Sequence, residues 1–73
     1  MDKPSFYEIR IEGGHLTDRW SEWFEGLAIH NDPDGGTTLS GALIDQAALM
    51  GVLGKIQALN LTLISVNRLS PQE

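Results

Sequence analysis

The sequence lacks cysteine and has few basic residues. Without cysteine, the 73-residue chain can form neither a disulfide nor a thiolate metal site, which fits a reducing, cytoplasmic setting. Five Lys and Arg stand against ten Asp and Glu, a net charge of −5 that argues against nucleic-acid binding, because a phosphate backbone requires clustered positive charge. No apolar run approaches the roughly 20 residues of a membrane span, and no apolar stretch of a signal peptide opens the chain. We expect neither nucleic acid nor a membrane as partner.

Histidine is scarce as well, and the residues that accompany it fit ordinary turns. The stretch "HNDPDGG" begins at His30, but it departs from the calcium-loop pattern, which requires Asp first and Glu twelfth. Ser40, His30 and Asp32 are the residue types of a hydrolytic triad, yet no nucleophile-elbow sequence surrounds the serine. We therefore predict no catalytic residue, no cofactor and no metal ligand, and we regard an enzyme as the less favoured class.

Four segments have the pattern of strands in a single domain spanning 1–73. Residues 6–12 ("FYEIRIE") alternate between apolar and charged, which is typical of a strand with one solvated face. Residues 27–31 and 37–42 flank "DPDGG", a turn sequence that predicts a hairpin. Residues 61–69 are apolar on both alternating faces, with Leu61, Leu63 and Leu69 on the face opposite Ile64.

Two segments have helical periodicity. In "TDRWSEWFEG" (17–26), Thr17 suits an N-cap and Leu16, Trp20, Trp23 and Phe24 share one stripe. We interpret this aromatic stripe as core, with Trp20 and Phe24 buried and Trp23 the more exposed ring. Residues 46–59 follow Asp45, a second N-cap, and have their own apolar stripe.

The element order β-α-β-β-α-β predicts a ferredoxin-like α+β plait. Right-handed crossovers would place both helices on one face of a four-stranded antiparallel sheet, with the strands in spatial order 4-1-3-2.

The back of the second helix breaks the usual pattern of a solvated surface. At 100° per residue, the strip opposite Leu49 contains only small residues: Ala47, Gly51, Gly54 and Ala58. Each interior glycine lowers the stability of the helix by about 0.8–1 kcal/mol relative to alanine. Such a loss usually marks a functional role or close packing. Either the glycines make room for Trp20 or Trp23 on the neighbouring helix, or the strip faces another chain.

Two further sets of residues are candidates for binding. Phe6, Leu61 and Leu63 fall on the sheet face that should be solvated, where they would form one apolar patch. Because a chain this short has a small core, we predict a homo-oligomer, most simply a homodimer, that pairs through this patch or through the helix strip. The second set is the loop Gly13, Gly14 and His15, whose backbone could hold a small anion beside a helix N-terminus.

Four stretches, "YEIRIEGGHL", "WSEWFEGLAI", "GGTTLSGALIDQAALMGVLGKI" and "LTLISVNRL", together resemble a family of small uncharacterised bacterial proteins. The family pattern reads YEIR…GHL…W..WF.GL…G.T.L.G.L.DQAAL…L.SV. The sequence departs from it in the extra glycine of "EGGHL" and in Met50, where many members have His. The resemblance implies a stand-alone bacterial cytosolic module and adds no site.

Three functions are compatible with these features. The first is an interaction or regulatory module that self-associates, with a possible protein partner. The second is an effector-sensing domain that binds a small molecule, and the third is a small enzyme whose site forms at a subunit interface.

Overall fold

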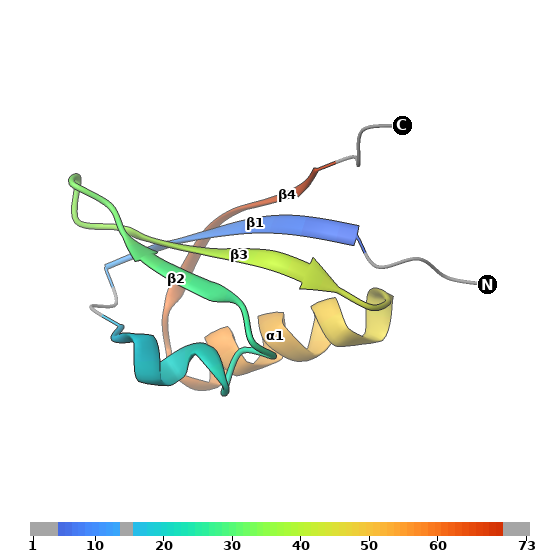
Figure 1. Ribbon diagram of the computed structural model, residues 1–73. Coiled ribbons are helices and arrows are strands. Elements are labelled where there is room, and N and C mark those ends of the chain that lie inside the picture. The colour runs from blue at the N-terminus through green and yellow to red at the C-terminus, as the bar shows by residue number, and fades with distance from the viewer. Residues whose placement is uncertain (1–4, 14–15, 70–73) are drawn as a thin grey trace.

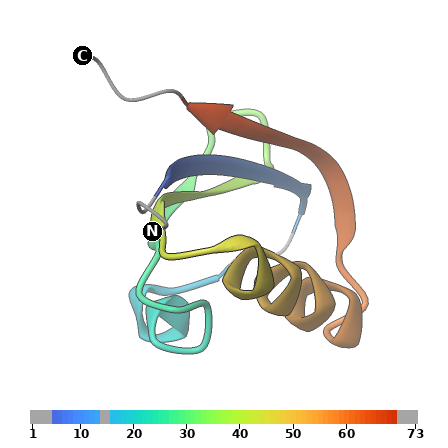
Figure 2. The ribbon, with the colours of Figure 1, turned by 90° about the vertical axis from the view of Figure 1, so that its right-hand side faces the viewer.

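The computed structural model describes residues 5–13 and 16–69, which contain four strands, one α-helix and one 3-10 helix (Figure 1). In chain order these are β1 (Ser5–Glu12), η1 (Asp18–Ser21), β2 (Ala28–Asn31), β3 (Thr37–Leu43), α1 (Gln46–Ala58) and β4 (Thr62–Leu69). The strands form one sheet in the order β2-β3-β1-β4, and every neighbouring pair is antiparallel. Seen end-on, α1 and the turns after η1 lie on the same side of the sheet (Figure 2). The α+β class is thus confirmed.

The prediction of a ferredoxin-like plait with two helices is wrong, because the described residues contain one α-helix. The segment predicted as the first α-helix forms η1, and residues 22–26 continue it as turns. Glu25 and Gly26 have φ values of 59° and 81°, which end the helical path after barely two turns. The hydroxyl of Ser21 donates to the Leu27 carbonyl at 2.8 Å and so holds the exit from these turns. A segment this short lacks the length to propagate an α-helix, and side-chain contacts decide its conformation.

The other elements agree with the sequence patterns to within one residue at each end. Asp45 caps α1, since its carboxylate accepts from the Ala48 N–H at 2.8 Å. Asn60 follows α1 with φ 61°, the left-handed conformation that commonly stops a helix. Local chemistry therefore determines where α1 begins and ends.

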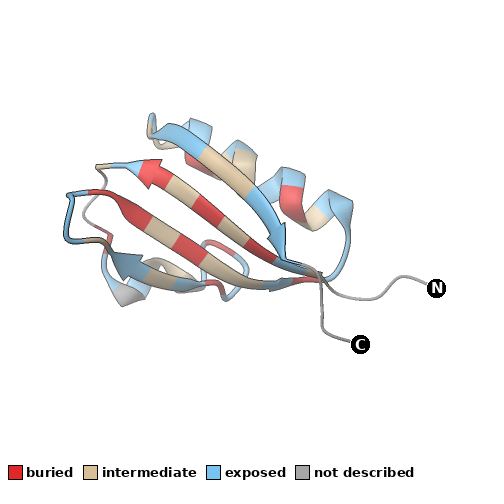
Figure 3. Ribbon diagram, turned by 90° about the horizontal axis from the view of Figure 1, so that it is seen from above, coloured by how far each residue is buried: buried red, intermediate tan, exposed pale blue. Residues whose placement is uncertain are grey.

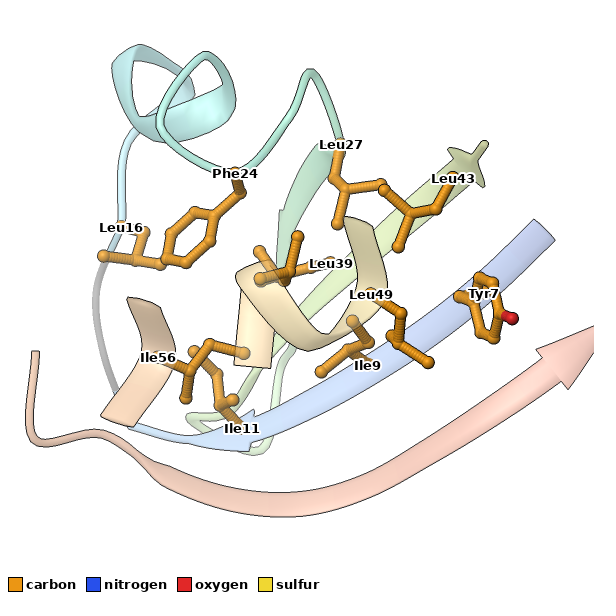
Figure 4. Packing of buried hydrophobic residues seen from close by; sticks show 11 residues of the cluster. Tyr7, Ile9, Ile11, Leu16, Phe24, Leu27, Leu39, Leu43, Leu49 and Ile56 are labelled. Atoms are coloured by element: carbon orange, nitrogen blue, oxygen red, sulfur yellow. The ribbon is translucent and has the colours of Figure 1, made fainter. Parts of the chain in front are cut away.

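The core lies between the sheet and the layer made by α1 and the turns. Burial alternates along β1 and β3, as the red and tan bands of Figure 3 show, because successive side chains point to opposite faces. Figure 4 shows how the buried side chains from both layers meet in this core. They are Tyr7, Ile9, Ile11, Leu16, Phe24, Leu27, Leu39, Leu43, Leu49, Val52 and Ile56.

The aromatic stripe divides between core and surface. Phe24 is completely buried, which confirms its predicted place in the core, whereas Trp20 is only half-buried at the edge of the cluster. Trp23 retains 44% of its exposure, in agreement with the expectation that it is the more exposed ring. Of the three aromatic side chains, Phe24 therefore contributes most to the core.

We predict that Phe24→Ala leaves little folded protein. Removal of a fully buried phenylalanine typically costs about 3–5 kcal/mol, comparable to the whole stability of a domain this small. Urea denaturation followed by circular dichroism would measure the loss, with Trp23→Ala as the control expected to change stability much less. A Phe24→Ala variant with the wild-type urea midpoint would contradict the core assignment.

Candidate interaction surface

The outward strip of α1 is open to solvent. Its four small residues, Ala47, Gly51, Gly54 and Ala58, are all exposed. A Cβ atom added at Gly51 or Gly54 would meet no other atom within 4 Å. The explanation that these glycines make room for Trp20 or Trp23 is therefore wrong. The strip contacts no other part of the described chain closely enough to require glycine.

This openness predicts that Gly51→Ala and Gly54→Ala stabilise the isolated chain. Both positions have space for a methyl group, and alanine in an exposed helix interior is favoured over glycine by about 0.5–1 kcal/mol. Thermal unfolding of the two single variants and the double variant, at protein concentrations low enough to keep the chain monomeric, would show the gain. A lower thermal midpoint would mean that the glycines are needed within the monomer.

One flank of α1 is fixed to the turns by Lys55. Its ammonium group donates to the Trp23 carbonyl at 2.8 Å and to Glu25 Oε2 at 3.1 Å. The same Nζ lies 5.1 Å from the centroid of the Trp23 ring. At 100° per residue, Met50 lies on the opposite flank of the helix from Lys55. Met50 is 58% exposed there.

Among the described residues, the last strand, β4, forms one edge of the sheet and pairs with β1 alone. A β-bulge interrupts the pairing, since Arg10 opposes Ser65 and Ile11 opposes Leu63, which leaves Ile64 without a partner on β1. Residues directly opposite each other in an antiparallel pair share a face. Leu63 therefore lies on the same side of the sheet as the buried Ile11, which is the side of α1.

The bulge separates the residues predicted to form one apolar patch on the outer face. Phe6 opposes Leu69, whereas Leu63 opposes Ile11, five residues further along β1 and about 17 Å away. Leu61 is half-buried against the core rather than free on the outer face. The single patch of Phe6, Leu61 and Leu63 is thus not present. The sequence pattern also missed Ile64, whose exposure of 53% follows from the bulge.

The segment that forms α1 and β4 has no carboxylate side chain, since residues 46–69 contain no Asp or Glu. The segment has only Lys55 and Arg68 as charges, so it contributes +2, and the rest of the chain contributes −7 to the net −5. Four large apolar side chains of the same segment are exposed: Met50, Leu63, Ile64 and Leu69. We call the exposed residues of α1 and β4 the acid-free surface. It combines apolar side chains, small residues and no negative charge.

The hairpin between β2 and β3, in contrast, is rich in charged and polar side chains. Arg10 on β1 lies 3.2 Å from Asp34 and 3.5 Å from Asp32. Asp32 also accepts a hydrogen bond from the Thr38 hydroxyl at 2.8 Å and lies 3.6 Å from His30. An open hollow of about 460 Å³ on the outer face of the sheet is lined by Arg10, Asp32, Asp34 and Thr38 of this cluster. They satisfy one another, and the cluster serves to hold the hairpin against β1.

The triad types Ser40, His30 and Asp32 do not assemble in this hairpin. His30 opposes Thr38, and Ser40 opposes Ala28, so the hydroxyl that reaches Asp32 belongs to Thr38. Nor does the described part of the chain contain a group of three His, Asp or Glu side chains arranged to hold a metal ion.

The carboxyl group of Asp34 makes the stability of the fold depend on pH. The Gly36 N–H donates to its carboxylate at 3.0 Å and, together with the charge of Arg10, holds the pKa of Asp34 below its ordinary value of 3.8. A carboxyl whose pKa is depressed on folding stabilises the fold above its ordinary pKa, and this contribution disappears as the pH falls through the folded pKa.

We therefore predict that Asp34→Asn lowers the thermal midpoint near pH 6, and that the difference from wild type shrinks as the pH falls below 3.8. Asparagine keeps an oxygen that can accept from Gly36, so the substitution mainly removes the charge. Thermal unfolding of both proteins across pH 3–6 would test this. A difference that stays constant over the whole range would show that the charge of Asp34 has no role.

The predicted anion loop is only partly visible, since Gly14 and His15 lie outside the described residues. Gly13 has φ 70°, and its carbonyl accepts a hydrogen bond from the Thr37 hydroxyl at 2.9 Å. On the other side of the loop, Asn31 donates to the Leu16 carbonyl at 3.1 Å. Both ends of the loop are therefore fixed to the hairpin.

A second open hollow, of about 440 Å³, lies along the turns and is lined by Thr17, Arg19, Trp20 and Trp23. It offers one guanidinium group and two indole rings. A small molecule in so open a hollow would leave much of its surface in water, whereas ligands in ordinary pockets bury most of theirs.

Comparison with known proteins gives a family and no activity. Residues 6–67 match the family described as Domain of unknown function (DUF8691), and the chain belongs to this family. No curated protein and no solved structure matches the chain. No helix in the described part of the chain is long and apolar enough to cross a membrane.

Proposed function

We propose that this protein is a small interaction module that acts through self-association, as a symmetric homodimer. The observation that supports the proposal is the acid-free surface, where exposed apolar residues of α1 and β4 lie in a segment without a single carboxylate. Large apolar side chains that stay exposed on a small protein are candidates for a protein interface. The chemistry of this surface suits contact with another protein better than contact with a charged ligand.

Charge favours a second copy at this place over any other part of the chain. Two chains with net charge −5 repel each other, and burying unpaired carboxylates in an interface costs several kcal/mol. A contact through residues 46–69 buries no carboxylate and keeps the negative charges of the two chains away from the interface, because the only charges of this segment are Lys55 and Arg68. Lys55 is already paired with Glu25 beside the turns, which leaves the centre of the surface uncharged.

The size of the domain adds a second reason. Eleven hydrophobic residues of the described part of the chain make up the buried core, and the chain has no cysteine to form a disulfide that would reinforce it. A typical stable interface buries about 800 Å² on each partner, which would add substantially to the apolar area that this domain removes from water. Dimer formation would therefore stabilise the fold as well as provide the function.

The setting of this module also belongs to the proposal. The absence of cysteine fits a reducing compartment, and the resemblance to the small bacterial family favours the bacterial cytoplasm. A regulatory role would follow if association with a second copy controlled access to the acid-free surface.

We expect light scattering across a dilution series to give twice the chain mass of 8.0 kDa at micromolar concentrations, falling toward one chain on dilution. Added salt should favour the dimer, because it screens the repulsion between two acidic chains. A dimer held by surface ion pairs would weaken in salt instead. A mass of one chain at every concentration would refute the proposal.

A further inference from the structure

We infer that the free edge of β4 is the dimer contact, where β4 pairs antiparallel with β4 of a second copy about a two-fold axis. This would join two four-stranded sheets into one continuous sheet. The inference rests on the proposed function, since it names the surface through which the copies associate. Its first support is that one side of β4 has no strand partner in the sheet β2-β3-β1-β4, so its edge presents backbone N–H and C=O groups for pairing.

The two edges of the sheet differ in their suitability for pairing. The edge strand β2 has four residues, packs beside η1, and ends in the ion cluster around Asp32. The edge strand β4 has eight residues, and most of its length is exposed in Figure 3. Natural edge strands usually avoid association through lysines, prolines or inward-pointing charges. In contrast, β4 has no proline and one charged residue, Arg68.

Two features of this edge oppose pairing: the bulge at Ile64, toward the beginning of the strand, and the charge of Arg68, which opposes the buried Tyr7 near its end. Beyond the bulge the register with β1 is regular, from Arg10 opposite Ser65 to Phe6 opposite Leu69. Five consecutive residues, 65–69, therefore form a flat template against which a second strand can pair.

The centre of this template, residues 65–67, is complementary to its own copy. A two-fold axis at Val66 places Val66 opposite Val66 and Ser65 opposite Asn67, the latter pair occurring twice. The first pair joins two β-branched apolar side chains, and the second joins groups that can hydrogen-bond across the strands. Arg68 is then opposite position 64 rather than opposite its own copy, whereas an axis at Arg68 would place two like charges together. This self-complementarity favours a second copy over an unrelated strand.

The same axis would also cover the apolar residues beside β4. Leu63 lies on the α1 side of the sheet, and Met50 is exposed on the flank of α1 opposite Lys55. In a continuous sheet the two α1 helices lie on the same face, so these side chains of both copies face the seam between them. Exposed apolar area on both elements is thereby removed from water.

The absence of cysteine makes the contact directly testable, because a single introduced cysteine gives a disulfide reporter without background. Directly opposed residues have Cβ atoms about 4.5–5.5 Å apart, near the range that a disulfide spans. In a glutathione redox buffer we expect V66C to form a covalent dimer on non-reducing gels. A47C on the α1 strip and A28C on β2, both at exposed positions, are the matched controls and should form at least tenfold less.

Paired charge variants test the register independently. In S65E/N67E the dimer would oppose glutamates of the two copies, and we expect at least a tenfold weaker association by light scattering. In S65E/N67K each glutamate would oppose a lysine of the other copy, and association should return to near the wild-type level. Circular dichroism of both variants at low concentration should show the same folded chain, because Ser65 and Asn67 lie outside the core cluster.

The outcomes separate this inference from the proposed function. If the wild type is dimeric but V66C crosslinks no better than A47C, or if both charge variants associate equally, the β4 contact is overturned while the interaction module stands. Preferential crosslinking of A47C would assign the contact to the α1 strip instead. A wild type that is monomeric at all concentrations would overturn both.

Discussion

The central strand β1 imposes the constraint on which the rest of the structure depends. It must hydrogen-bond on both edges, to β3 and β4, while one of its faces is buried under α1 and the turns. The buried face of β1 contains Tyr7, Ile9 and Ile11, and the outer face contains Glu8 and Arg10, which alternate with them. Successive side chains of a strand point to opposite faces, so the polar residues of β1 all lie on the outer face of the sheet. The carboxylates of the hairpin contact Arg10 on this face.

The layer beneath β1 is built from two unequal parts. The helix α1 is capped by Asp45 and stopped at Asn60, so local interactions define it before it packs. The turns after η1 have no such definition and depend on Phe24, whose ring fills the core beside Leu16 (Figure 4). Lys55 then joins the two parts by contacts to Trp23 and Glu25. The packing of Phe24 and the contacts of Lys55 thus hold the turns in the position that the second helix would occupy in a plait.

The separation of charge along the chain follows the arrangement of these parts. Carboxylates are found around the hairpin and the turns, where solvent and Arg10 accommodate them, and none occurs from residue 46 to residue 69. This leaves α1 and β4 as the part of an acidic protein that another acidic protein can approach. The proposal of a homodimer and the inference of β4 pairing both rest on this combination of a segment without carboxylates, exposed apolar groups and a free strand edge.

The sequence by itself determined the elements whose signals are local: four strands by the alternation of their residues, the hairpin by "DPDGG", and the limits of α1 by Asp45 and Asn60. It also determined the charge separation and the bare strip of α1, since both are properties of residue order. Only the tertiary structure decided that residues 18–26 form a 3-10 helix and turns, because burial of Phe24 outweighs a helical periodicity too short to propagate. Only the tertiary structure decided the bulge at Ile64, which reverses the faces of Leu61 and Leu63, because a bulge arises from the fit between two strands and has no signature in either strand alone.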